Sequence, residues 1–175
     1  MKHLALVLTT MCIYLFALTA WSGELTVGDM APEFSLKATD GKTYTLGDFH
    51  GKETVVLAWF PKAYTSGCTI ECKSLTENGH LIRKFQASYF MISVDELEDN
   101  KGFATKTKAD FPLLSDPSKE TARAYGVLNQ GGWANRHTFY IGANGKILAI
   151  DKDIKPATSA QDMAAKLADL ATPKR

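Results

Sequence analysis

Runs of apolar residues and short alternating segments predict the strands of a central sheet. Val55 to Phe60 is apolar throughout, which predicts a strand buried on both faces, and Pro61 ends it. Tyr89 to Val94 is a second run of this kind. Asp40-Gly41 and Asn144-Gly145 are hairpin turn signals. Shorter runs predict further strands at residues 31–37, 42–46, 111–114, 138–141 and 146–151.

The segments between these strands carry apolar residues near helical spacing. This spacing predicts helices at residues 66–84, 100–108, 119–125 and 157–170, with a loop at residues 47–51. The order is a hairpin, strand-helix-strand-helix, a second hairpin and a closing helix. It predicts an α/β three-layer sandwich of thioredoxin-like architecture, with a mixed central sheet and an N-terminal β-hairpin extension.

The first 22 residues differ from the rest of the chain. Lys2 precedes an apolar run from Leu4 to Leu18, and small residues follow at Ala20 and Ser22. This order is typical of a secretory signal peptide. The run is shorter than the ~20 residues of a membrane-spanning helix, although an uncleaved anchor is the alternative. We therefore predict a signal at residues 1–22, a single domain at residues 23–175, and export to the periplasm or beyond without stable membrane association.

The charge balance gives no reason to expect a nucleic-acid partner. The chain carries 20 Lys and Arg against 19 Asp and Glu, and loss of Lys2 with the signal makes the numbers equal. Phosphate backbones are held by a clear excess of basic side chains, which this chain does not have. The chain also shows no spare apolar stripe, so we predict a monomer.

Two cysteines, Cys68 and Cys72, lie where the helix after the central strand should begin. A thiol at a helix N-terminus faces unpaired backbone N–H groups and the positive end of the helix dipole, and both favour the thiolate. A thiolate is a nucleophile and a metal ligand. In open α/β sheets, sites lie beyond the carboxyl ends of the strands, and Pro61 to Cys68 leaves the central strand at such an end.

The spacing of Pro61, Thr65 and Cys68 resembles the active-site signature of peroxiredoxins. The sequence from Pro61 to Glu71 is most similar to that of the peroxiredoxin Q group, also called bacterioferritin comigratory proteins. The resemblance covers roughly residues 25 to 170. Further matching segments are Ala31-Pro-Glu-Phe-Ser-Leu, Phe111-Pro-Leu-Leu-Ser-Asp, Arg136-x-Thr-Phe-Tyr-Ile and Asn144-Gly-Lys-Ile.

The resemblance implies a thiol-dependent peroxidase acting on hydrogen peroxide or small organic hydroperoxides, without cofactor or metal. Cys68 would attack the O–O bond and become a sulfenic acid. Thr65 and the backbone N–H groups of Gly67 and Cys68 can donate hydrogen bonds to the leaving oxygen. Arg136 would hold the thiolate and orient the peroxide, and Pro61 would shape the pocket.

These residues also have simpler interpretations. Thr65 or Ser66 can cap the helix, which does not exclude catalysis. Arg136 can belong to a surface ion pair. Glu71 is expected to be a first-turn charge that complements the helix dipole.

The role of Cys72 does not transfer directly, because the resolving cysteine on this helix in peroxiredoxin Q proteins usually lies five residues after the peroxidatic one, not four. Residues four apart on a helix have Cβ atoms about 5–6 Å apart, whereas a disulfide needs about 3.5–4.5 Å. We hypothesise that the first turn unwinds, Cys72 attacks the sulfenic acid of Cys68, and a thioredoxin-like dithiol protein reduces the resulting disulfide.

Three alternatives remain open from sequence. A Sco-like copper protein would use Cys68, Cys72 and a distant His, for which His137 is available. A thiol-disulfide oxidoreductase acting on proteins would normally carry a Cys-x-x-Cys pair, one residue shorter than this interval. A static disulfide between the two cysteines is the third alternative.

Overall fold

A mixed seven-stranded sheet forms the centre of the protein in the computed structural model, which describes residues 24–175. The predicted signal at residues 1–22 lies outside the described residues. The strands are β1 (Ser35–Ala38), β2 (Thr43–Thr45), β3 (Thr54–Trp59), β4 (Ala87–Ser93), β5 (Leu113–Ser115), β6 (Thr138–Ile141) and β7 (Ile147–Asp151).

The sheet order is β2-β1-β5-β4-β3-β6-β7. The three central strands β3, β4 and β5 are parallel, and the hairpins β1–β2 and β6–β7 add antiparallel strands at the two edges. The predicted mixed sheet and N-terminal hairpin are therefore confirmed.

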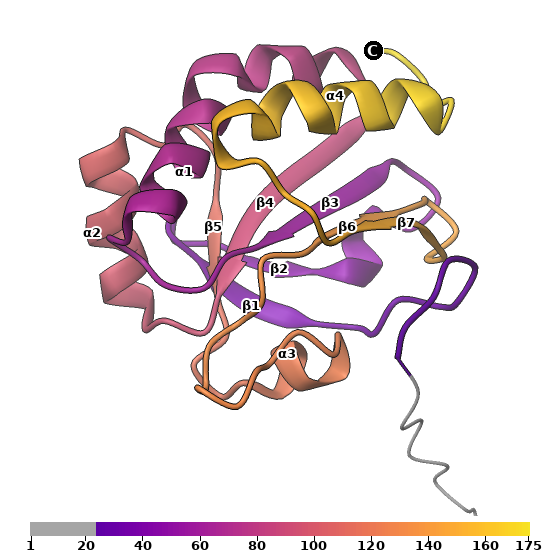
Figure 1. Ribbon diagram of the computed structural model, residues 1–175. Helices are drawn as coiled ribbons and strands as arrows, with labels where there is room; N and C mark the ends of the chain where they lie inside the picture. The colour runs from indigo at the N-terminus through magenta and orange to yellow at the C-terminus, as the bar shows by residue number, and fades with distance from the viewer. Residues whose placement is uncertain (1–23) are drawn as a thin grey trace, which may run out of the picture.

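Helices cover both faces of this sheet, which gives the predicted three layers (Figure 1). On one face lie α1 (Ser66–Asn78), α2 (Leu97–Thr107) and α4 (Ser159–Asp169). The opposite face is covered by α3 (Glu120–Ala124), the segment before β1 and the 3₁₀ turn after β2. Every residue of β3 is buried, because its alternate side chains enter the two cores on either side of the sheet.

Two local predictions were wrong. The segment predicted as one helix over residues 66–84 ends as an α-helix at Asn78 and continues as a 3₁₀ helix, Gly79–Lys84. A Cβ at Gly79 would collide with the Tyr89 hydroxyl, so the chain passes close to β4 at this point. The loop predicted at residues 47–51 begins instead as a 3₁₀ turn, Leu46–Phe49, which buries Leu46 and Phe49.

Helix α2 is fixed to the sheet by a buried amide. The Asn100 side chain has no exposed area, and its Nδ2 donates to Ser93 Oγ at 3.1 Å and Ser115 Oγ at 2.8 Å. These hydroxyls lie at the carboxyl ends of β4 and β5, so the amide sets the position of α2 beside the ends of the parallel strands.

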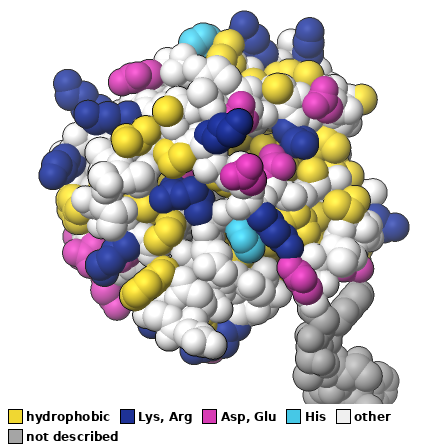
Figure 2. Space-filling model, in the orientation of Figure 1, with side chains coloured by type: hydrophobic (Ala, Val, Ile, Leu, Met, Phe, Trp, Pro, Cys, Tyr) yellow, Lys and Arg dark blue, Asp and Glu magenta, His cyan; other side chains and the backbone are white. Residues whose placement is uncertain are grey.

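The described surface is mixed in charge. On the face seen in Figure 2, basic and acidic side chains are interspersed, in keeping with their nearly equal numbers. Within residues 24–175, none of the helices combines the length and the apolar character that crossing a bilayer requires.

Candidate active site

The site lies beyond the ends of three neighbouring strands in the middle of the sheet. Parallel strands β3 and β4 end there, and the antiparallel strand β6 begins there, with Ala58 opposite Thr138. The Trp59 N–H donates to the His137 carbonyl at 2.8 Å, which fixes the start of β6 beside the end of β3. This pairing brings Arg136 next to the segment that follows β3, although the two are far apart in sequence.

Cys68 lies in the first turn of α1, as predicted, and has no exposed area. The first of the helical hydrogen bonds runs from Thr69 N to Thr65 O at 2.9 Å. The N–H groups of Gly67 and Cys68 precede this bond and lack intrahelical partners, so they point their donors out of the helix N-terminus. Cys68 is thus held at the positive end of the helix dipole.

The Arg136 guanidinium contacts the sulfur directly. Its Nη2 lies 3.1 Å from Cys68 Sγ, and its Nη1 donates to Glu71 Oε2. Burial lowers the pKa of Arg136, but the charges of Glu71 and Cys68 outweigh burial and raise it above its usual range. A permanent cation with two oriented donors therefore bridges the nucleophile and a carboxylate.

Glu71 is a residue whose function the sequence reasoning missed. The expectation of a first-turn charge that complements the helix dipole is wrong, since Glu71 lies in the second turn of α1 and is fully buried. Its Oε1 accepts a hydrogen bond from Ser159 Oγ at 3.4 Å, at the start of α4. Burial raises the pKa of Glu71, while Arg136 and Ser159 lower it, so the ionised form depends on these two partners.

Gly67 and Pro61 act on the backbone at and before the start of α1. A Cβ at Gly67 would lie 3.3 Å from Arg136 Nη2, so glycine allows the guanidinium to approach the helix N-terminus. Pro61 follows Phe60, just after β3 ends at Trp59, and is partly exposed, and its role in shaping the pocket stays a prediction. Its ring fixes the direction in which the chain leaves the sheet.

Thr65 is the N-cap residue of α1, but its hydroxyl makes no capping hydrogen bond. The hydroxyl donates instead to the Lys62 carbonyl at 3.0 Å. The hydroxyl proton thus points to Lys62, and the expected donation to the leaving oxygen stays a prediction, because a hydroxyl can rotate toward a bound substrate. The Thr65 oxygen keeps its lone pairs and can accept a hydrogen bond.

Cys72 lies one turn after Cys68 in a different environment. Both cysteines are free thiols, so the static disulfide is not present. Cys72 Sγ is 3.1 Å from Thr107 Oγ1 on α2, and the Thr107 hydroxyl donates its own proton to the Phe103 carbonyl at 2.8 Å. The Cys72 S–H is therefore the donor to Thr107. Burial raises the pKa of Cys72 to about 11, so it is a thiol at neutral pH.

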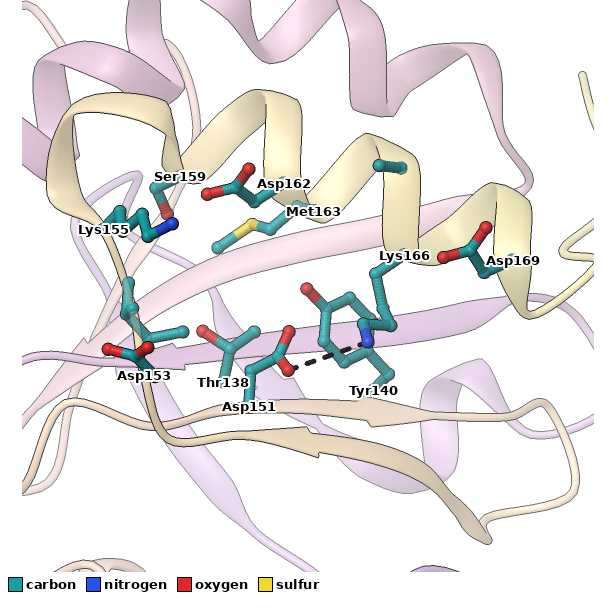
Figure 3. A pocket seen from close by; sticks show the side chains of 12 residues that line it. Thr138, Tyr140, Asp151, Asp153, Lys155, Ser159, Asp162, Met163, Lys166 and Asp169 are labelled. Atoms are coloured by element: carbon teal, nitrogen blue, oxygen red, sulfur yellow. Dashed lines mark ion pairs between the residues drawn. The ribbon is translucent and has the colours of Figure 1, made fainter.

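A polar crevice of about 280 Å³ lies behind the site, between α4 and strands β6 and β7 (Figure 3). Thr138 and Tyr140 form its floor, and the ion pair between Lys166 and Asp151, at 3.8 Å, crosses it. Ser159 lines the crevice and also bonds to Glu71. The crevice is therefore connected to the active site through the hydrogen bond between Ser159 and Glu71, and Cys68 does not line it.

His137 lies away from the two cysteines. It lies beside Glu24 and Lys152 and lines a small crevice with Tyr125 and Phe139, whose core is on the other face of the sheet from the two cysteines. Burial lowers the pKa of His137. Among residues 24–175, no three His, Cys, Asp or Glu side chains gather into a group that could hold a metal ion.

Comparisons with known proteins agree with this geometry. The profile of the AhpC/TSA family matches residues 27–150. The chain is 35% identical over 138 residues to peroxiredoxin Bcp of Escherichia coli K12, covering 75% of this chain and 88% of that protein. It is 36% identical over 126 residues to alkyl hydroperoxide reductase E of Mycobacterium tuberculosis H37Rv, covering 70% of this chain and 82% of that protein.

The chain belongs to the AhpC/TSA family of peroxiredoxins. The crystal structure of peroxidoxin BcpB from Mycobacterium tuberculosis superposes with a TM-score of 0.76 at 28% identity, covering 83% of this chain and 98% of that one. The predicted resemblance and fold class are confirmed, and the chain is an enzyme of the thiol-dependent peroxidase class. The comparisons give no support to the copper-binding alternative.

Glu71→Gln tests whether the carboxylate orients Arg136. The amide cannot form the charged pair, so the guanidinium loses its fixed direction, and we expect the reaction of Cys68 with hydrogen peroxide to slow by about tenfold. Stopped-flow fluorescence measures this rate constant. Glu77→Gln, on the exposed face of α1, is the matched control and should react like the parent. Equal rates for Glu71→Gln and the parent would contradict the orienting role.

Proposed function

We propose that Cys68 reduces peroxides by direct attack of its thiolate on the oxygen that carries the hydrogen. An S–O bond forms, the O–O bond breaks, and the second oxygen leaves as an alkoxide or hydroxide that takes a proton from solvent. Cys68 is oxidised to a sulfenic acid, and the peroxide is reduced to an alcohol or water. The contact of 3.1 Å between Arg136 Nη2 and Cys68 Sγ is the observation that carries this proposal.

Two groups with opposite hydrogen-bonding character position the peroxide. The Thr65 oxygen, whose proton is donated to Lys62, accepts the O–H of the peroxide. Arg136 and the free N–H groups of the first turn of α1 donate to the oxygens and stabilise the negative charge that develops on the leaving one. This arrangement orients the O–O bond toward the sulfur.

The covered position of Cys68 favours small substrates. The sulfur has no exposed area in the reduced enzyme, so a peroxide reaches it only after small movements of neighbouring side chains. Hydrogen peroxide and small organic hydroperoxides are the substrates that such movements admit.

Cys72 resolves the sulfenic acid in this proposal. Its sulfur lies in the same helix, four residues after Cys68, but it is kept protonated and bonded to Thr107 on α2. Unwinding that starts at the first turn of α1 and extends to Cys72 breaks that contact and brings the two sulfurs together. An S–S bond then forms, and the thiol proton leaves with the hydroxyl of the sulfenic acid as water. A helix end opens at small cost compared with the core.

A thioredoxin-like dithiol protein completes the cycle by exchange, because its two thiols can reduce the disulfide and become oxidised in turn. We further propose that the enzyme works as a monomer in the export compartment to which the sequence at residues 1–22 points. This location requires a reductant in the same compartment.

Intact mass after one equivalent of hydrogen peroxide tests the cycle. We expect the parent to lose the mass of two hydrogen atoms, with digestion placing the disulfide between Cys68 and Cys72. Cys72→Ser should gain one oxygen, because nothing resolves its sulfenic acid, and Cys68→Ser should be unchanged. A parent enzyme that keeps the oxygen or forms a disulfide-linked dimer would refute the role of Cys72.

Thr107→Val tests whether the hydrogen bond to Thr107 restrains resolution. Valine has nearly the same shape but no acceptor, so Cys72 leaves its site more easily, and disulfide formation should become about two- to tenfold faster. Rapid-quench mass spectrometry follows the conversion of sulfenic acid to disulfide. Thr105→Val, on the exposed face of the same helix, is the control. An unchanged or slower conversion in Thr107→Val would show that the contact does not limit this step.

A further inference from the structure

Asp95 connects the strand next to β3 with the segment that leads into the active site. It follows β4 and is 8% exposed. Its Oδ2 accepts a hydrogen bond from the backbone N–H of Ala63 at 2.9 Å, and its Oδ1 lies 3.3 Å from Lys62 Nζ. One carboxylate therefore holds the N–H of the peptide between Lys62 and Ala63 and also pairs with the Lys62 ammonium.

The position of Asp95 is itself fixed by buried hydrogen bonds. Its backbone N–H donates to Ser93 Oγ at 3.2 Å, and this hydroxyl also accepts from Asn100 Nδ2 at 3.1 Å. Ser93 and Asn100 have no exposed area. Asp95 is thus anchored to β4 and α2, so its position is set independently of the segment that it binds.

The segment held by Asp95 is strained. Tyr64 has a φ of 67°, a left-handed conformation that is unfavourable for a bulky side chain. Such a conformation persists only where its surroundings fix it from both sides. On one side, Asp95 holds the N–H of Ala63. On the other, the Tyr64 ring packs edge-on against Phe103, with ring centres 5.5 Å apart.

The strained residue comes directly before Thr65. The Thr65 hydroxyl donates to the carbonyl of Lys62, whose peptide is the one that Asp95 binds. Without the carboxylate, the buried N–H of Ala63 would have no partner, and the strain at Tyr64 could relax by rotation of this peptide. The Lys62 carbonyl would then turn away from the Thr65 hydroxyl.

We propose that Asp95 is a positioning residue for the peroxidase reaction. It fixes the peptide between Lys62 and Ala63, so that the Lys62 carbonyl takes the proton of Thr65 and the Thr65 oxygen is left to accept the peroxide O–H. Asp95 touches neither the sulfur nor the peroxide and acts through Thr65. The inference rests on the role proposed above for Thr65.

A double-mutant cycle tests this inference. Second-order rate constants with hydrogen peroxide are measured by stopped-flow fluorescence for the parent, Asp95→Ala, Thr65→Val and the double variant. Asp95→Ala should slow the reaction by about 10- to 100-fold, since misplacement of an orienting group has effects of this size. Thr65→Val should be at least as slow. The double variant should be no slower than Thr65→Val, because both changes remove the same interaction.

Two further variants separate positioning from a general loss of stability. Asp95→Asn keeps an oxygen that can accept from Ala63, so it should restore the rate to within about threefold of the parent. Asp99→Ala removes a carboxylate from the exposed first turn of α2 without touching the segment, and should react like the parent. If Asp95→Ala is too unstable to measure, Asp95→Val is closer to aspartate in volume, has no acceptor and carries the same expectation.

The possible failures are distinguishable. A parent-like rate in Asp95→Ala, with Thr65→Val slow, would overturn the positioning role and leave the proposed function intact. An equal further loss when Asp95→Ala is added to Thr65→Val would also overturn it, because Asp95 would then act by another route. A parent-like rate in Thr65→Val would contradict the proposed role of Thr65 itself, and with it the positioning inference.

Discussion

The Arg136 guanidinium, placed between the sulfur of Cys68 and the buried carboxylate of Glu71, is the interaction on which the active site depends. Glu71 has no exposed area, so its charge is sustained by Arg136 and Ser159 and not by water. The carboxylate in turn prevents the guanidinium from turning into solvent. A cation held in this way can remain at the sulfur before, during and after the O–O bond breaks, with little reorganisation.

Helix α1 gives its two cysteines opposite chemical environments over a single turn. Cys68 lies among unpaired N–H groups and beside a cation, which suits a nucleophile. Cys72 lies in the apolar core and donates to Thr107, with a pKa raised to about 11 by burial, which suits a thiol that is inert until the helix opens. The two reactions of the proposed cycle are therefore separated by a conformational change and not only by distance.

The sequence predicted the sheet, the hairpins and the position of Cys68 because local patterns determine them: the apolar runs at β3 and β4, the turn signals, and a cysteine at a helix start. The resemblance to a known family added Arg136 to the predicted site, because the local sequence pattern does not show that this residue lies near Cys68. The contacts of Glu71, Thr107 and Asp95 were not predicted, since each depends on which elements pack together. The direction of the Thr65 hydroxyl and the helix end at Gly79 were missed for the same reason.

The most direct test compares Arg136→Lys with Arg136→Ala by the rate constant for reaction with hydrogen peroxide. It asks whether the reaction needs the double contact of the guanidinium, to Cys68 and to Glu71. Lysine keeps the charge, but its single ammonium cannot serve the sulfur and Glu71 with two oriented planar donors. We expect both variants to react about 100-fold more slowly than the parent. An Arg136→Lys enzyme that reacts nearly as fast as the parent would show that charge alone suffices, and would contradict the bridging role assigned to the guanidinium.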